Sequence, residues 1–155
     1  MEDVILDKML SGARSILVMS NFALLKQFSA KPHICDLSLS RVLLNDTAIP
    51  WIFLIPMRDN VLQMNHLSEV DQRQLMAEIN IASNAMESIF PCTRLNVAAI
   101  GNKTPQLHIH VICRTENDAH WPETVWQYSC AKMTGDECEI RRKAIEDALR
   151  LKISQ

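Results

Sequence analysis

Residues 37–44, LSLSRVLL, alternate between apolar and polar side chains, and this period of two predicts a β-strand. The next six residues, NDTAIP, favour a turn, and the apolar WIFLIP at 51–56 predicts a second, fully buried strand. Pro56 ends that strand because proline has no N–H to donate to a central ladder. The two strands are expected to pair as an antiparallel hairpin.

The most regular helical pattern lies between Ser68 and Phe90. Ser68 followed by Asp71 resembles a capping box in which Asp replaces the usual Glu, and Pro91 follows the last helical residue. Apolar residues recur at helical spacing along one face: Leu75, Ile79, Ala82, Met86 and Ile89. We interpret this face, with the methionines of the helix, as core packing.

A second hairpin is predicted after this helix, with strands at about residues 95–100 and 106–113. The connecting GNKTP supplies the turn residues Gly, Asn and Pro. A loop rich in aromatic residues follows, AHWPETVWQYS, and residues 136–153 then predict an amphipathic C-terminal helix. The apolar face expected for this last helix carries Ile140, Ile145, Ala148 and Leu149.

These elements indicate one α+β domain with a mostly antiparallel sheet, because strands and helices do not alternate as βαβ units. A chain of 155 residues suits a single domain with one core. Hydrophobic residues make up 48% of the chain and charged residues 22%, which is typical of a soluble globular protein.

The net charge of −2 and the pI near 6.2 argue against nucleic acid polymers and anionic membranes as partners. A small nucleotide is still allowed, because one local site can bind phosphate. No apolar run is long enough for a membrane span, and the first 20 residues lack the basic head and long apolar region of a secretory signal. We therefore expect a cytoplasmic protein.

The number of cysteines is odd, and no two of them form a CxxC pair. They are Cys35, Cys92, Cys113, Cys130 and Cys138. We interpret them as reduced thiols of a cytosolic protein, with a zinc site as the weaker alternative.

The segment QLHIHVIC at 106–113 places two histidines inside a predicted strand. Side chains two residues apart point to one face, so Gln106, His108 and His110 should share a side while the apolar residues between them enter the core. Such a row suits nucleophilic catalysis at phosphorus, or a metal site completed by His33, His120 or a cysteine. Two surface histidines are the third interpretation.

The chain resembles the histidine triad (HIT) family, which carries His-φ-His-φ-His-φ-φ (φ is apolar) on the second strand of a hairpin. Here glutamine replaces the first histidine. The segments LLNDTAIPWIFLIPMR, LNVAAIGN and HWP are also similar to family segments, so the likeness runs from about residue 19 to about residue 126. It is greatest to the bacterial diadenosine-polyphosphate-hydrolase-like branch, where Gln-φ-His-φ-His is usual. The resemblance implies a HIT-like fold, with about five strands, a long central helix and a C-terminal helix.

The resemblance also implies a reaction and the residues that perform it. His108 would attack the α-phosphorus of a purine nucleoside phosphoramidate or dinucleoside polyphosphate, forming a nucleotidyl-histidine that water hydrolyses. A neutral imidazole, with an ordinary pKa of about 6.5, is suited to this attack near neutral pH. His110 and Asn102 would hold the phosphate oxygens, and the reaction requires no metal or other cofactor.

By the same resemblance, Asp46 would accept hydrogen bonds from the ribose hydroxyls, with Leu44 and Asn45 flanking the base. Simple turn chemistry is the alternative explanation of Asn45 and Asp46. The family commonly forms homodimers, and the apolar content of the long strands and the C-terminal helix agrees with one.

Gln106 departs from the family pattern, because glutamine cannot supply a proton near pH 7. Loss of general acid help would slow turnover by about 10²–10⁴-fold, and polyphosphate leaving groups would suffer least. The alternative function is therefore a nucleotide-binding regulator with slow or no turnover.

The resemblance divides the chain into an N-terminal extension, residues 1–18, and a HIT domain, residues 19–155. We expect that translation starts at Met19, and a short amphipathic helix in the extension is the alternative.

Overall fold

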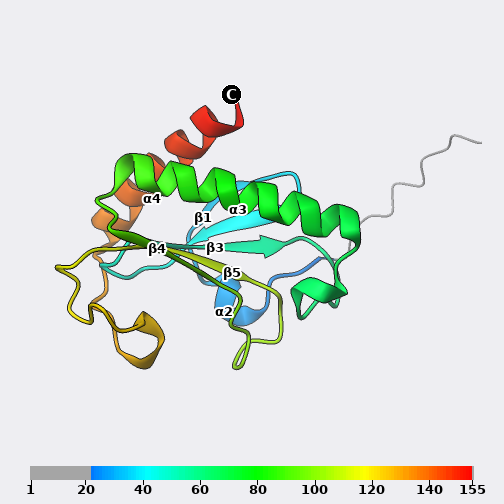
Figure 1. Cartoon of the computed structure of the whole chain (residues 1–155), viewed down its shortest axis with the longest axis horizontal. Coiled ribbons are helices and arrows are strands. Elements are labelled where there is room, and N and C mark those ends of the chain that lie inside the picture. The colour runs from blue at the N-terminus through cyan, green and yellow to red at the C-terminus, as the bar shows by residue number, and fades with distance from the viewer. Residues whose placement is uncertain (1–21, 155) are drawn as a thin grey trace, which may run out of the picture.

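The computed structural model describes residues 22–154, and within this range five antiparallel strands form one sheet in the order β1-β2-β3-β5-β4. The strands are β1 (His33–Asp36), β2 (Ser40–Leu44), β3 (Trp51–Pro56), β4 (Arg94–Ala98) and β5 (Ile109–Arg114). The helices are α2 (Lys26–Ser29), α3 (Glu69–Ile89) and α4 (Gly135–Ile153), with 3-10 turns η1 (Met64–His66) and η2 (Val125–Gln127). The predicted α+β fold is confirmed (Figure 1).

The predicted N-terminal extension, residues 1–18, lies outside the described residues, as does the alternative of an amphipathic helix there. Within residues 22–154, no helix has the length and apolarity needed to cross a membrane.

The first hairpin is confirmed, with Leu43 of β2 opposite Phe53 of β3. The strand β2 begins at Ser40 and not at residue 37, because the N–H of Leu37 donates to the Ser40 carbonyl (2.8 Å) across a tight turn. The short segment before that turn forms β1, which pairs with β2 at the sheet edge. Its four residues, HICD, have no regular alternation that would predict a strand.

The long helix α3 begins as predicted, with the Ser68 hydroxyl accepting from the Asp71 N–H at 3.1 Å. Only half of the capping box forms, because the Asp71 carboxylate accepts two hydrogen bonds from Arg58 instead. The predicted apolar face is buried except at its last position, where Ile89 is 37% exposed.

The C-terminal helix α4 is also confirmed, and Thr134 with Glu137 forms a full capping box that the prediction missed. Ile140, predicted on the apolar face, is 72% exposed, so that assignment is wrong. At about 100° per residue, Ile140 lies about 140° around the helix from Ile145 and on the opposite side from Leu149. The residues that enter the core are Ile145, Ala148 and Leu149.

The second hairpin forms with a longer connection than predicted, because β4 ends at Ala98 and β5 begins at Ile109. Before β5, the N–H of Leu107 donates to the Val61 carbonyl (2.9 Å) and not to β4. His108 is therefore the residue immediately before the strand, and Gln106 lies in the connection.

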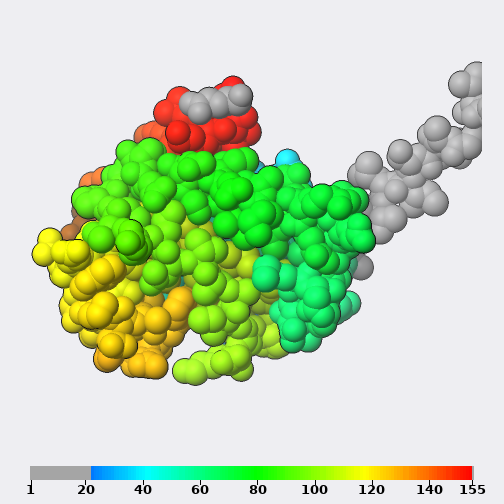
Figure 2. Space-filling model, in the orientation of Figure 1, coloured from blue at the N-terminus to red at the C-terminus, as the bar shows by residue number. Residues whose placement is uncertain are grey.

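The strand β5 divides the molecule into two sides. Ile109, Val111 and Cys113 join the core beneath α3 and α4, while Ile112 packs with residues of β3, α2 and η2 on the opposite face. Figure 1 shows α3 and α4 on one side of the sheet and the β4–β5 connection and η2 region on the other, and Figure 2 shows the surface of the same segments. His110 belongs to this second face, which the long helices leave open.

We predict that Ile145→Ala lowers the free energy of unfolding by roughly 2–5 kcal/mol, because it removes buried methylenes from a packed core. Ile140→Ala makes the same change in the same helix at an exposed position, and should change stability by no more than about 0.5 kcal/mol. Urea denaturation of both variants measures the difference. Equal losses would contradict the orientation of α4.

Candidate active site

His108 and His110 lie side by side on the open face of the sheet. Each is 5% exposed, and their ring centroids are 4.8 Å apart. Gln106 does not complete the predicted row, since its side chain turns toward residues 23–25. Two rings therefore form the centre of the site.

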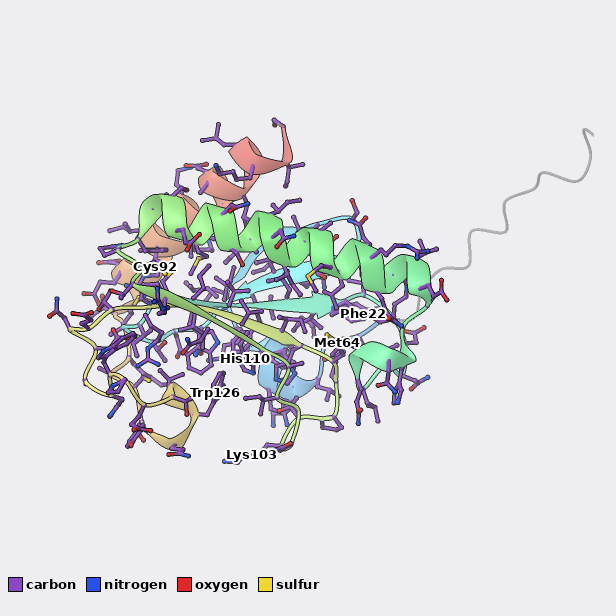
Figure 3. All side chains as sticks on the ribbon, in the orientation of Figure 1. Phe22, Met64, Cys92, Lys103, His110 and Trp126 are labelled. Atoms are coloured by element: carbon purple, nitrogen blue, oxygen red, sulfur yellow. The ribbon has the colours of Figure 1, made fainter. Side chains whose placement is uncertain are left out.

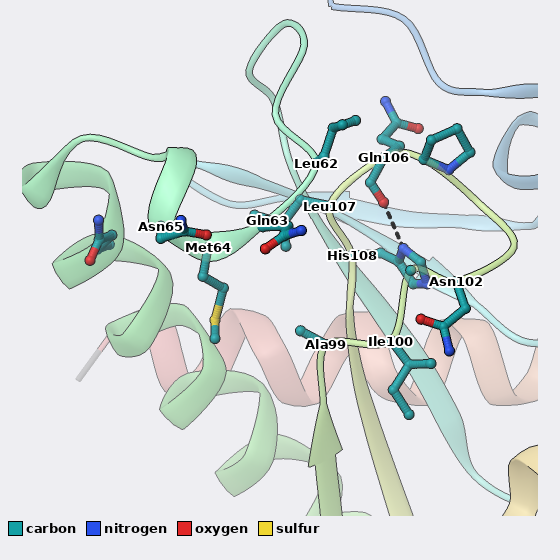
Figure 4. A pocket seen from close by; sticks show the side chains of 13 residues that line it. Leu62, Gln63, Met64, Asn65, Ala99, Ile100, Asn102, Gln106, Leu107 and His108 are labelled. Atoms are coloured by element: carbon teal, nitrogen blue, oxygen red, sulfur yellow. Dashed lines mark hydrogen bonds between the residues drawn. The ribbon is translucent and has the colours of Figure 1, made fainter.

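The ring of His108 is oriented by the backbone two residues before it. Its Nδ1 lies 2.7 Å from the carbonyl oxygen of Gln106, which can only accept a hydrogen bond. Nδ1 must therefore carry the proton, and in the neutral ring the lone pair is on Nε2. Figure 4 shows this hydrogen bond and the Asn102 side chain beside the ring.

The ring of His110 has the opposite proton arrangement. The indole N–H of Trp51, a group that can only donate, lies 3.0 Å from its Nδ1. The proton of neutral His110 is therefore on Nε2. That nitrogen is buried and has no hydrogen-bond partner among residues 22–154.

Burial keeps both imidazoles neutral. It lowers the pKa of His108 below the usual 6.5, and it lowers the pKa of His110 to about 4. The neighbouring His108 adds to the decrease at His110, and the backbone of Ile100 opposes it in part. Near neutral pH the site therefore presents one nitrogen lone pair and one N–H donor on adjacent rings.

Aromatic side chains surround His110. Its ring centroid lies 5.2 Å from that of Phe53, 5.4 Å from that of Trp51 and 5.5 Å from that of Trp126. The indole N–H of Trp126 is also buried, and it too has no partner within the described part of the chain. Figure 3 shows Trp126 approaching His110 from the loop after β5.

That loop is fastened to the sheet by Arg114, which is 1% exposed. The guanidinium pairs with Asp118 (2.5 Å) and donates to the Glu123 carbonyl (3.0 Å) and the Asn96 amide oxygen (3.2 Å). We had no prediction for Arg114 or Trp126. The sequence could have indicated Arg114 by its spacing, because it lies four residues after His110 and side chains four apart in a strand share a face.

A cavity of about 680 Å³ opens beside His108. Asn102 and Gln106 contribute to its lining, with residues of the η1 region across from them (Figure 4). The structure thus brings Asn102 to the same cavity as His108, and its role toward a phosphate stays a prediction.

Asp46 and Asn45 lie in the turn between β2 and β3, and neither lines this cavity. The Lys31 ammonium group contacts the Asn45 amide oxygen (2.7 Å) and the Asp46 carboxylate, whose other oxygen is 3.1 Å from Lys132. These lysines, Lys31 first, lower the pKa of Asp46 to about 2. The carboxylate is therefore ionised throughout the neutral range.

Leu44 is not placed where the prediction put it. Its side chain is fully buried in the core on the helix-covered face, together with Val42 and Ile52. Leu44 is the last residue of β2, and side chains alternate between the two faces of a strand, so Leu43 reaches the histidine side and Leu44 does not.

A metal site built on His108 and His110 would need a third ligand. No three His, Cys, Asp or Glu side chains of residues 22–154 form a group that could hold a metal ion. His33 pairs with Asp36 (2.9 Å), and His120 stacks on Tyr128 with centroids 4.0 Å apart. The five cysteines, all within this range, form no disulfide.

Comparison with known proteins adds a family and three similar crystal structures. Residues 32–117, more than half of the chain, match the HIT domain family. A histidine triad protein of Bradyrhizobium japonicum shares 38% identity over 85% of this chain and 98% of its own, with a TM-score of 0.77. No curated protein matches the chain.

Two further structures are histidine triad proteins of Sinorhizobium meliloti and Marinobacter aquaeolei. Each shares 28% identity with this chain over 84% of its length, with TM-scores of 0.80 and 0.79. The alignments cover 98% and 97% of those two chains.

We predict that the free energy of unfolding falls as the pH is lowered from about 6.5 toward 4. The pKa of His110 is about 4 in the folded protein and about 6.5 in the unfolded chain, so the unfolded chain takes up the proton first. This one group can contribute at most about 3 kcal/mol. Urea denaturation at several pH values measures the profile, and His110→Gln should flatten it. The same profile in the variant would contradict the burial of a neutral His110.

Proposed function

The protein belongs to the HIT domain family, and from that premise we propose that it is a nucleotide-binding hydrolase or transferase in which His108 attacks the α-phosphorus. The substrates we propose are nucleoside phosphoramidates or dinucleoside polyphosphates, as in the diadenosine-polyphosphate-hydrolase-like branch. The observation that carries this proposal is the opposite proton arrangement of the two rings.

The two rings supply the two groups that such a reaction needs. His108 has its lone pair on Nε2, because its Nδ1–H donates to Gln106, and it lines the open cavity. His110 has an N–H on Nε2 that makes no hydrogen bond within residues 22–154, so a nonbridging phosphate oxygen would satisfy a buried donor. Trp126 offers a second N–H beside it that is likewise unsatisfied within these residues.

In the first step, Nε2 of His108 forms a bond to the α-phosphorus and the bond from phosphorus to the leaving group breaks. The imidazole becomes cationic, and the Gln106 carbonyl stabilises this charge by accepting from Nδ1–H. The electron pair of the broken bond leaves with the polyphosphate, or with the amine, which takes a proton from solvent as it leaves. His110 and Asn102 hold the nonbridging oxygens during the transfer.

In the second step, water attacks the same phosphorus and the phosphorus–nitrogen bond to His108 breaks. The products are a nucleoside monophosphate and neutral His108, since the proton of the water passes to solvent. Splitting the reaction into two steps in this way is the benefit of covalent catalysis. A nucleotide acceptor in place of water would make the protein a transferase.

The nucleoside would be held by the turn between β2 and β3. The Asp46 carboxylate, kept ionised by Lys31 and Lys132, can accept from ribose hydroxyls while still paired, because each oxygen has two lone pairs. Asn45 would lie near the purine base.

We also propose that the protein is a cytoplasmic homodimer. The edge strand β4 supports the dimer, because it leaves one row of backbone groups and the partly exposed Val97 open to a second copy.

A second candidate, a nucleotide-binding regulator with little turnover, is favoured by one contact. The Gln106 amide is engaged by backbone groups of residues 23 and 25, so the side chain at the first position of the triad row is turned away from a leaving group and supplies it no proton.

We predict that wild-type protein incubated with adenosine phosphoramidate or a diadenosine polyphosphate acquires an adenylyl group on the His108 peptide. The adduct should be labile in acid and stable in base, and His108→Ala should lack it and lose turnover by about 10³-fold or more. Rapid-quench peptide mass spectrometry with product analysis measures both.

His33→Ala is the matched control, because His33 is an exposed histidine on β1 at the far edge of the sheet. Nucleotide-induced thermal stabilisation without adduct or product would favour the regulator. Equal turnover by wild type and His108→Ala would contradict the proposed function.

A further inference from the structure

The side chain of Gln106 is hydrogen-bonded to the backbone of the N-terminal segment and is not directed at a substrate. Its side-chain amide nitrogen donates to the Ala23 carbonyl at 2.9 Å, and its amide oxygen accepts from the Leu25 N–H at 3.0 Å. Both groups belong to a segment more than 80 residues away in the sequence. The side chain thus pairs with this segment much as a neighbouring strand would.

The clamped segment leads directly to the nucleophile. Leu25 is the N-cap residue of α2, and its carbonyl accepts from the N–H groups of Phe28 and Ser29. Phe28 is 4% exposed, and its ring centroid lies 4.8 Å from that of His108 and 5.6 Å from that of Phe53. Holding Leu25 therefore holds Phe28 against the ring of His108.

Gln106 also contacts His108 directly, through its own backbone. Its backbone carbonyl accepts from Nδ1 of His108, while its side chain fixes the segment that packs on the same ring. Gln106 lines both the cavity of His108 and a neighbouring cavity of about 420 Å³, whose lining includes Ala23 and Leu25. It lies where the N-terminal segment meets the site.

We propose that Gln106 is a positioning residue: its amide clamps residues 23–25 and so holds Phe28 against the imidazole of His108, and it does not act on the leaving group. The catalytic part of this inference rests on the proposed function, whereas the clamp itself does not.

Histidine would not replace this amide. An amide presents its acceptor oxygen and its donor nitrogen from one end of the side chain, so one backbone segment can pair with both. The two nitrogens of an imidazole point away from each other, so a ring at this position could hydrogen-bond to only one of the two backbone groups. Restoring the full triad in this chain therefore releases the segment.

The clamp is tested by amide hydrogen exchange of Leu25, measured by NMR on wild type, Gln106→Ala and Gln106→His. Exchange of this amide should be about tenfold faster in both variants, because its acceptor is lost or misplaced. Gln27→Ala is the matched control, since Gln27 is an exposed glutamine of the same segment and its loss should leave Leu25 protected. Equal exchange in wild type and Gln106→Ala would overturn the proposal.

Gln106→Glu separates the clamp from a general loss of structure. The ionised carboxylate can still accept from the Leu25 N–H but repels the Ala23 carbonyl, so it keeps one half of the clamp, whereas the protonated carboxyl both donates and accepts as the amide does. After correction for the intrinsic pH dependence of exchange, protection of Leu25 in this variant should lie between that of Gln106→Ala and that of wild type at neutral pH, and should approach wild type as the pH is lowered. The proposal would be overturned if protection of Leu25 did not recover at low pH in Gln106→Glu and was also lost at every pH in Gln27→Ala.

The positioning role is tested by kinetics on adenosine phosphoramidate. Gln106→His should lower kcat by about tenfold or more with little change in KM, because the nucleophile loses its alignment and gains no useful proton donor. A kcat above that of wild type would overturn the proposal and show that a leaving-group acid is what the chain lacks. If wild type itself shows no turnover, the proposed function fails, and the exchange experiment still decides whether the clamp exists.

Discussion

The pairing of β5 between β3 and β4 is the constraint on which the rest of the structure depends. Because side chains alternate along a strand, this pairing sends Ile109, Val111 and Cys113 into the core and leaves His110 on the other face. A shift of one residue would exchange the two sets. The hydrophobic core and the site are thus fixed by the same hydrogen-bonded ladder, and neither can be changed without the other.

The same face collects the groups that determine the chemistry of the histidines. Trp51 comes from β3 and donates to His110, and the loop held by Arg114 brings Trp126 to the same ring. These neighbours exclude water, so the pKa of His110 falls to about 4 and the ring stays neutral. A buried imidazole that is neutral can remain a hydrogen-bond donor without the cost of burying a charge.

Much of the fold could be predicted from the sequence, because period-two and helical patterns are local properties. The strand at 51–56 and the helix from Ser68 are of this kind. What could not be predicted depends on contacts between distant segments, and the clamp of Gln106 on residues 23–25 is of this kind. The errors at Ile140 and Leu44 have a local cause, because helical spacing separates Ile140 from Leu149 and strand alternation separates Leu44 from Leu43. Arg114 was missed because two of its partners, Asp118 and Glu123, lie in a loop without a pattern.

The most direct test is ¹⁵N NMR of the imidazole nitrogens near neutral pH, without ligand, because protonated and unprotonated ring nitrogens have distinct chemical shifts. The account predicts two neutral rings with opposite protons: His108 protonated at Nδ1 and His110 protonated at Nε2. If both rings carried the proton on the same nitrogen, or if His110 were cationic, the site would not present a lone pair beside a donor, and the account would be contradicted.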